Sequence, residues 1–166
     1  MLSSLGTRRA RLLASALVVA TLTAGCFGGG TTKSAAREIP LPASGVTREV
    51  YDLVNADRAA NGLPALSWHP QLGGLAQGWA EHMGSTGKLE HSDLDATLRS
   101  PEFDAFHRLG ENILVGNCNM TAVEIEQAWM NSPGHRANIL GDFNTIGVGV
   151  VCAGGRLWAT QSFGTV

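Results

Sequence analysis

The sequence lacks the features that mark several common classes of protein. Of its 166 residues only three are cysteine, 6% are aromatic and 16% are charged, and the formal net charge is −2 at pH 7. Without a basic excess, the sequence argues against nucleic-acid binding. It contains no CxxC pair, no HExxH motif and no GxSxG motif. The usual signatures of thiolate zinc sites, zinc proteases and serine hydrolases are therefore missing.

Hydrophobic residues are plentiful, at 44% of the sequence, and they are mixed with polar ones along most of the chain. This composition is typical of a globular protein with a buried core. Once the N-terminal quarter is set aside, the remaining length suits one domain. We therefore expect a single folded domain at residues 46–166.

The first 25 residues predict a bacterial lipoprotein signal peptide. Cationic residues ending at Arg11 are followed by the apolar run LLASALVVA and then by small residues. That run is too short to span a bilayer as a helix. The sequence LTAGC resembles the lipobox of lipoprotein precursors, where cleavage would leave Cys26 as the diacylated first residue. The alternative is an ordinary secreted protein with an incidental cysteine, and export by either the Sec or the twin-arginine route stays open.

Residues 26–45 are rich in glycine, threonine and serine and have no hydrophobic periodicity. Such a stretch is typical of a flexible tether. Acyl chains on Cys26 would hold the protein to the membrane, since each buried methylene contributes about 0.8 kcal/mol. We therefore expect an exported protein that is lipid-anchored at the extracytoplasmic face of the cell membrane.

The two other cysteines, Cys118 and Cys152, are an even pair, as expected for a protein in an oxidising compartment. We expect a disulfide between them. In the chain-entropy model, closing a loop of this length contributes on the order of 3 to 4 kcal/mol to stability. The alternative is two buried free thiols.

The spacing of apolar residues predicts three helices. The first runs from a cap at Thr47 to about residue 61, and the second runs from Pro70 to the glycines at 84 and 87. The sequence TAVE at 121–124 is a capping box that begins the third. His91 therefore falls in the loop after the second helix, and His135 follows the third.

From residue 146 onward the hydrophobic period changes from that of a helix to that of a strand. Residues 146–163 predict a β-hairpin that turns on Gly154 and Gly155. Helices followed by an antiparallel hairpin indicate an α+β domain with helices on both faces of a small sheet.

Two imidazoles and one carboxylate, His91, Glu111 and His135, are the candidate site residues. An imidazole can ligate a metal or move a proton near neutral pH, and a carboxylate can orient it, act as a base or join the ligation. Each residue also has a structural interpretation. His91 can cap a helix C-terminus, Glu111 can bond backbone amides near Asn112, and His135 can anchor the turn before it.

Five motifs carry a resemblance to a known family. They are NADR at 55–58, KLEHS at 88–92, GENI at 110–113, WMNSPGHR at 129–136 and IGVGV at 146–150. In this order they resemble the CAP superfamily of cysteine-rich secretory, antigen 5 and pathogenesis-related 1 proteins, also called the SCP domain, in its bacterial branch. The resemblance implies an α-β-α sandwich with a small antiparallel sheet between helices. It also implies a cleft where His91, Glu111 and His135 converge and can hold a divalent metal, zinc or calcium.

The sequence departs from the family pattern at one acid. Many eukaryotic members have a second glutamate shortly after the tryptophan of the third helix, where this chain has Asn131 and Ser132. The loss of a carboxylate removes a ligand or base. Glu126 lies before that tryptophan, and we interpret it as a solvated charge on the helix surface. We expect Gln161, on the last strand, to border the cleft.

Three functions follow from these residues. The first is a binding or interaction module whose cleft takes an envelope ligand, which is a lipid, a peptide or a glycan. The second is a metal-dependent hydrolase in which His91 and His135 hold the ion and Glu111 activates water. The third is a structural or host-interaction protein without a ligand. A serine hydrolase built on Ser92 or Ser132 is disfavoured, and the sequence names neither the ligand nor the oligomeric state.

Overall fold

The computed structural model describes residues 37–166, so the predicted signal peptide, Cys26 and most of the predicted tether lie outside these residues. The elements are α1 (Val46–Ala60), β1 (Ser67–Trp68), α2 (Pro70–Thr86), α3 (Leu94–Arg99), a 3-10 turn (Pro101–Phe103), β2 (Arg108–Asn117), α4 (Ala122–Met130), α5 (Pro133–Ile139), β3 (Thr145–Ala153) and β4 (Arg156–Thr165). Within the part of the chain described, no helix combines the length and the apolar character needed to cross a membrane.

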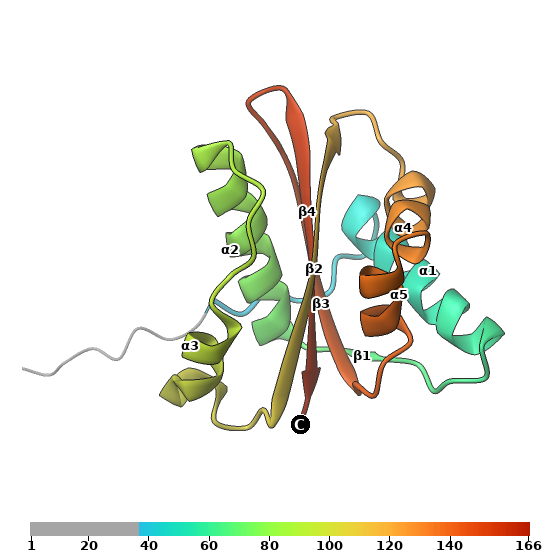
Figure 1. Ribbon diagram of the computed structural model, residues 1–166, viewed down its shortest axis with the longest axis vertical. Coiled ribbons are helices and arrows are strands. Elements are labelled where there is room, and N and C mark those ends of the chain that lie inside the picture. The colour runs from blue at the N-terminus through green and yellow to red at the C-terminus, as the bar shows by residue number, and fades with distance from the viewer. Residues whose placement is uncertain (1–36) are drawn as a thin grey trace, which may run out of the picture. The chain divides into compact units, whose positions relative to one another are not determined.

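The four strands form one sheet in the order β1-β3-β4-β2, with helices on both faces. Strand β4 pairs antiparallel with both β2 and β3, while the short β1 pairs parallel with β3. Helix α2 covers one face, and α1, α4 and α5 cover the other (Figure 1). The predicted α+β class and α-β-α sandwich are therefore confirmed. Strand β2 lies at one edge of the sheet, so only one of its two sides is paired with another strand.

Apolar periodicity accounts for the helices that cover the sheet. Val50 and Val54 of α1 pack with Trp129 of α4 in a fully buried cluster. Helix α2 begins at Pro70 and α4 carries the predicted capping box, so both starts are confirmed. The predicted cap at Thr47 is wrong, because α1 begins at Val46 behind Gly45, whose φ of 96° suits glycine.

Two glycines let α2 lie directly on strand β3. A Cβ atom built on Gly147 would overlap the backbone of Leu72, and one on Gly149 would overlap the backbone of Gln77. No larger residue fits at either position without moving the helix. The IGVGV motif therefore brings α2 into backbone contact with the sheet.

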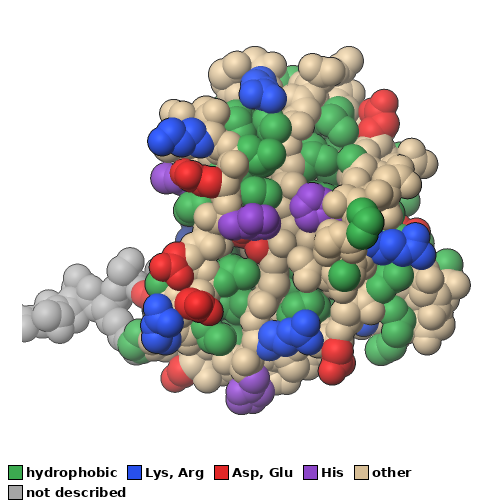
Figure 2. Space-filling view, in the orientation of Figure 1, with side chains coloured by type: hydrophobic (Ala, Val, Ile, Leu, Met, Phe, Trp, Pro, Cys, Tyr) green, Lys and Arg blue, Asp and Glu red, His purple; other side chains and the backbone are tan. Residues whose placement is uncertain are grey.

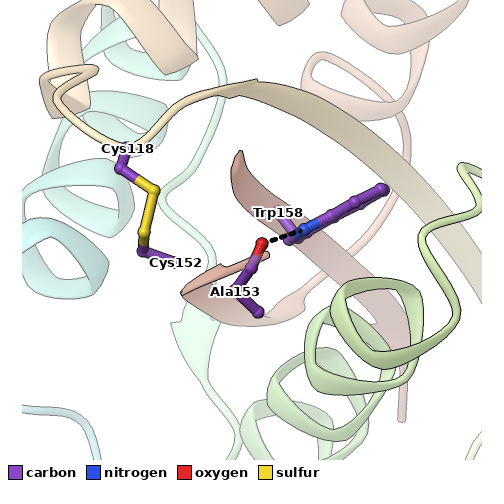
Figure 3. The surroundings of a disulfide bond; sticks show 4 residues. All are labelled: Cys118, Cys152, Ala153 and Trp158. Atoms are coloured by element: carbon purple, nitrogen blue, oxygen red, sulfur yellow. Dashed lines mark hydrogen bonds between the residues drawn. A yellow bond between two sulfur atoms is a disulfide. The ribbon is translucent and has the colours of Figure 1, made fainter. Parts of the chain in front are cut away.

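The predicted hairpin and disulfide are both present. Strands β3 and β4 are joined at Gly154 and Gly155, whose φ angles of 60° and 75° suit a tight hairpin turn. Cys118 and Cys152 are bonded with their Cα atoms 5.4 Å apart, a usual separation. Figure 3 shows this bond near Trp158, whose Nε1 donates to the Ala153 carbonyl at 3.2 Å. The disulfide thus links the ends of the two strands that flank β4.

The last residues of the predicted tether, 37–45, have no regular secondary structure but lie against the domain. The amide of Ile39 donates to the Pro70 carbonyl at 2.9 Å, and its carbonyl accepts from Trp68 Nε1 at 3.1 Å. The Arg37 carbonyl occupies the place that a side chain on Gly74 would take. This segment therefore reaches the domain at the N-terminal end of α2.

Candidate functional site

The three predicted site residues come from both sides of the edge strand β2. Successive side chains of a strand point to opposite faces. Glu111 therefore points toward the loop between α2 and α3, which carries His91, and Asn112 points toward α5, which carries His135. His135 was predicted to follow the third helix, and it lies in the first turn of a separate short helix, α5.

Glu111 holds His91 and Ser92 through both of its carboxylate oxygens. Its Oε1 atom lies 2.8 Å from His91 Nδ1 and accepts from the Ser92 amide at 3.0 Å, while Oε2 accepts from Ser92 Oγ at 2.7 Å. The Glu111 side chain is 1% exposed, whereas that of His91 is 59% exposed. Because a carboxylate can only accept, the proton of neutral His91 sits on Nδ1. The Nε2 lone pair is then left for solvent or a ligand.

Two serines, Ser92 and Ser132, lie in segments next to the predicted site histidines. The hydroxyl of Ser92 donates to Glu111, so its proton is committed to a carboxylate rather than to an imidazole. Ser132 occupies the N-cap position of α5. Neither residue forms the serine–histidine pair that activates a hydroxyl. The expectation that a serine hydrolase is disfavoured stays a prediction.

His135 is half-buried, and its environment favours the neutral ring. Burial lowers the pKa of His135, and the positive charge of a protonated His91 lowers it further. The two imidazoles are thus close enough to interact electrostatically. Figure 2 shows two histidine side chains near each other in the middle of the visible face. A neutral imidazole can accept a hydrogen bond or ligate a cation.

An open hollow of about 480 Å³ lies beside this histidine pair. It is lined by His91, Ser92, Asp93, Leu94, Asp95, Gly110, Glu111 and Asn138. Of the three predicted site residues, His91 and Glu111 are in the lining and His135 is not. The hollow is therefore formed mainly by β2 and by the segment that begins at His91.

Under the cleft, four polar side chains form a continuous chain of hydrogen bonds from α5 to α4. Asn138 Nδ2 donates to Asn112 Oδ1 at 2.9 Å, and Asn112 Nδ2 donates to the His135 carbonyl at 3.0 Å and to Gln161 Oε1 at 2.9 Å. Gln161 Nε2 then donates to Glu126 Oε2 at 2.9 Å. We refer to Asn138, Asn112, Gln161 and Glu126 as the buried amide–acid chain.

Two sequence-based expectations about residues of the buried amide–acid chain are wrong. Gln161 is 0% exposed and lies beneath the cleft instead of at its border, because it faces inward from a central strand. Glu126 is 2% exposed and is not a solvated surface charge, because α4 is covered by α1 as well as by the sheet. Burial, and then the nearby charge of Asp57, raises the pKa of Glu126 to about 8, against a lowering effect of the Gln161 hydrogen bond.

The opposite end of α5 is held by a buried arginine. Arg58, on α1, is 2% exposed. Its Nη1 donates to the carbonyls of Ile139 and Gly141 at 2.8 and 2.9 Å, and its Nε donates to that of Pro64 at 2.8 Å. Burial lowers the pKa of Arg58, and the charge of Asp142 opposes that effect. Arg58 belongs to the NADR motif, but its partners are backbone carbonyls, which carry no sequence signal.

The predicted metal-binding set, His91, His135 and Glu111, fits only in part. The two imidazoles are available, but both oxygens of Glu111 already accept hydrogen bonds. Glu111 instead occupies the position behind His91 that carboxylates often take behind metal-bound histidines. Among residues 37–166 no group of three or more histidine, cysteine, aspartate or glutamate side chains is arranged to hold a metal ion. Catalytic zinc sites commonly use three protein ligands.

A three-layer α-β-α fold with a hollow beside its edge strand, lined by His91 and Glu111, is the arrangement that the resemblance to SCP-type domains implies. The model of the cysteine-rich secretory protein (CAP) family matches residues 51–163. The chain therefore belongs to the CAP family, as the sequence motifs predicted. The match begins in α1 and ends in β4, so it includes every element that forms the cleft.

Relatives of known sequence or structure agree with this assignment. YkwD of Bacillus subtilis is 36% identical over 142 residues, which cover 81% of this chain and 51% of YkwD, so the chain spans about half the length of this relative. An extracellular SCP-domain protein of Bacillus anthracis has a TM-score of 0.63 and 30% identity, covering 73% of this chain and 40% of that one. An outer surface protein of Borrelia burgdorferi, at 17% identity, shares the fold with a TM-score of 0.63 over 72% of this chain and 92% of its own.

Proposed function

We propose that this protein is a lipid-anchored, extracytoplasmic binding module whose cleft holds the polar end of an envelope ligand between His91 and His135. The observation that carries the proposal is the state of Glu111. Its two oxygens accept three hydrogen bonds, and these bonds fix the His91 ring so that Nε2 is left free beside the open hollow. A rigid polar group next to a concave surface is the usual arrangement of a ligand site.

The same observation weighs against the metal-dependent hydrolase. A glutamate that activates water must reach that water with a free lone pair, whereas the Glu111 side chain is 1% exposed and three of its roughly four acceptor sites are already used. The two imidazoles can still hold a divalent cation as part of a bound ligand, and such a cation would supply charge to bind a carboxylate or phosphate. The proposal therefore assigns to Glu111 the role of orienting His91.

Export and surface location are part of the proposal. The signal peptide, the lipobox cysteine at residue 26 and the disulfide all suit an oxidising compartment outside the cytoplasm. Two similar proteins of known structure are described as an extracellular protein and an outer surface protein. These observations support a protein that is held at the cell surface.

The cleft is tested by nuclear magnetic resonance on the isotope-labelled protein. Envelope lipids in micelles, short peptides and soluble cell-wall glycan fragments are titrated in turn. We expect one of the three classes to shift the amide signals of residues 91–95 and of β2, and we expect His91→Ala to weaken that binding about tenfold or more, the cost of one hydrogen bond to a buried or charged group.

The matched control is His107→Ala, which removes an exposed histidine that does not line the hollow. It should bind as the unchanged protein does. If none of the three classes shifts the cleft signals, the binding module is wrong and the structural interpretation is favoured. Conversion of a probe into a new product, lost in Glu111→Gln, would favour the hydrolase.

The lipid anchor is tested by Cys26→Ser. Without its thiol the residue cannot be acylated, so the protein should move from the membrane fraction to the soluble fraction on centrifugation of lysed cells. Cys118→Ser is the control, because that cysteine lies in the domain disulfide and its loss should not change the fraction. Membrane association that persists in Cys26→Ser would show that the anchor is not at this residue.

A further inference from the structure

The buried amide–acid chain has a direction. Each amide donates its N–H toward α4, from Asn138 to Asn112, from Asn112 to Gln161, and from Gln161 to Glu126. An amide group has one donor end and one acceptor end. The Gln161 amide therefore takes its orientation from the acceptor at the end of the chain, the Glu126 carboxyl group, while Asn112 and Asn138 also donate to backbone carbonyls of the site.

Stability does not explain a glutamate at this position. Glu126 is 2% exposed, and its Oε1 atom has no hydrogen-bond partner among the described residues. Burial of a carboxyl group costs free energy, and an apolar side chain of similar volume is often more stable at such a site. An unpaired buried polar atom in a folded protein calls for an explanation.

The end of the buried amide–acid chain opposite Glu126 contacts the backbone of two predicted site residues, Glu111 and His135. Asn112 uses one amide group to bind both Gln161 and the His135 carbonyl, and Asn138 binds the Glu111 carbonyl at 3.1 Å. Helix α5 is only 7 residues long. So short a helix is not stable by itself, and bonds to the rest of the protein must hold it in place. The position of His135 is therefore set partly by Asn112.

We propose that Glu126 is a positioning residue for the cleft, which acts through Gln161 and Asn112 to hold the first turn of α5 and thus His135. Loss of the acceptor at Glu126 frees the Gln161 amide to turn, and Asn112 can then lose its hold on the His135 carbonyl. This inference rests on the proposed function for its biological meaning. Its test needs no ligand, so it can fail or succeed separately from the binding proposal.

The charges around Glu126 define what its titration reports. Asp57 on α1 acts on it directly. Arg58, also on α1, donates to backbone carbonyls near the end of α5, and on α5 itself Arg136 is exposed while His135 is half-buried. On β2, Glu111 binds His91 on the opposite face of the sheet. In a pH titration followed by nuclear magnetic resonance, a signal that reports Glu126 has the same midpoint as the carboxyl carbon of Glu126.

The first test compares Glu126→Leu with Glu126→Gln in the full chain, by nuclear magnetic resonance of the side-chain amides. Leucine removes the acceptor, so we expect the amide signals of Gln161, Asn112 and Asn138 and the backbone signals of α5 to move. Glutamine keeps an acceptor oxygen and should restore most of the original positions. Gln127→Leu, an exposed change on the same helix, is the matched control and should leave the α5 signals in place.

The second test uses the unchanged protein, so it does not depend on the folding of a variant. The carboxyl carbon of Glu126 and the side-chain amide of Asn112 are followed from pH 5 to pH 9. We expect both to shift with one midpoint, and we expect this shift of Asn112 to vanish in Glu126→Gln. Shifts confined to Gln161, or an unchanged midpoint for Asn112 in Glu126→Gln, would overturn the proposal.

Discussion

Replacement of Arg58 by alanine should lower the free energy of unfolding by roughly 3 to 5 kcal/mol. The guanidinium is almost fully buried and donates to the carbonyls of Pro64, Ile139 and Gly141 at 2.8 to 2.9 Å. Alanine leaves these carbonyls without donors and leaves a cavity between α1 and the end of α5. Urea denaturation followed by tryptophan fluorescence measures the loss.

Two further variants separate the causes of that loss. Arg58→Lys keeps the charge but lacks the planar group that reaches several carbonyls at once, so we expect an intermediate loss. Arg99→Ala removes an exposed arginine at the end of α3 and should change stability by less than about 0.5 kcal/mol. A loss in Arg58→Ala as small as that in Arg99→Ala would show that the carbonyls find other donors.

Glu126→Gln should change how stability depends on pH. The pKa of Glu126 is raised from its ordinary value of 4.5 to about 8 in the folded protein. The stabilisation from its proton is complete below the unfolded value and is lost as the pH rises toward 8. Glutamine does not titrate. Relative to the unchanged protein, the variant should therefore gain stability between pH 4.5 and pH 8, by on the order of 5 kcal/mol.

Unfolding by urea at a series of pH values measures this difference. Glu124→Gln on the same helix is a control with the opposite sign. Its hydrogen bonds with Thr121 lower the pKa of Glu124, so the stabilisation from that carboxylate is lost as the pH falls. The Glu124→Gln variant should therefore be less stable than the unchanged protein at higher pH, and this difference should shrink at low pH. A constant difference between Glu126→Gln and the unchanged protein would show that the pKa of Glu126 is the same in the folded and the unfolded state.

Arg58 and the buried amide–acid chain from Glu126 act on opposite ends of helix α5. Arg58 binds carbonyls at and beyond the C-terminal end of α5, and the chain from Glu126 reaches the His135 carbonyl in its first turn. A helix of this length has little stability of its own. The position of His135 in the cleft is therefore decided by buried polar groups on α1, α4 and the sheet.

Much of the fold could be predicted from local patterns. The capping box at Thr121, the helix start at Pro70 and the two glycines of the hairpin turn all act on neighbouring residues, so their effects can be read from short stretches of sequence. Strand β2 and helix α5 were not predicted. The first contains Gly110, Glu111 and Asn112, whose burial on an edge strand follows from the loops and helices on either side.

The sequence alone determined the family motifs, the cysteine pair and the candidate site residues, because these depend on which residues are present and in what order. Only the tertiary structure decided what Glu111, Gln161 and Glu126 do. The partners of Glu111 lie 19 and 20 positions away, and Glu126 is 35 positions from Gln161. Burial and hydrogen bonding across such separations arise when the helices and the sheet pack together, and no local pattern encodes them.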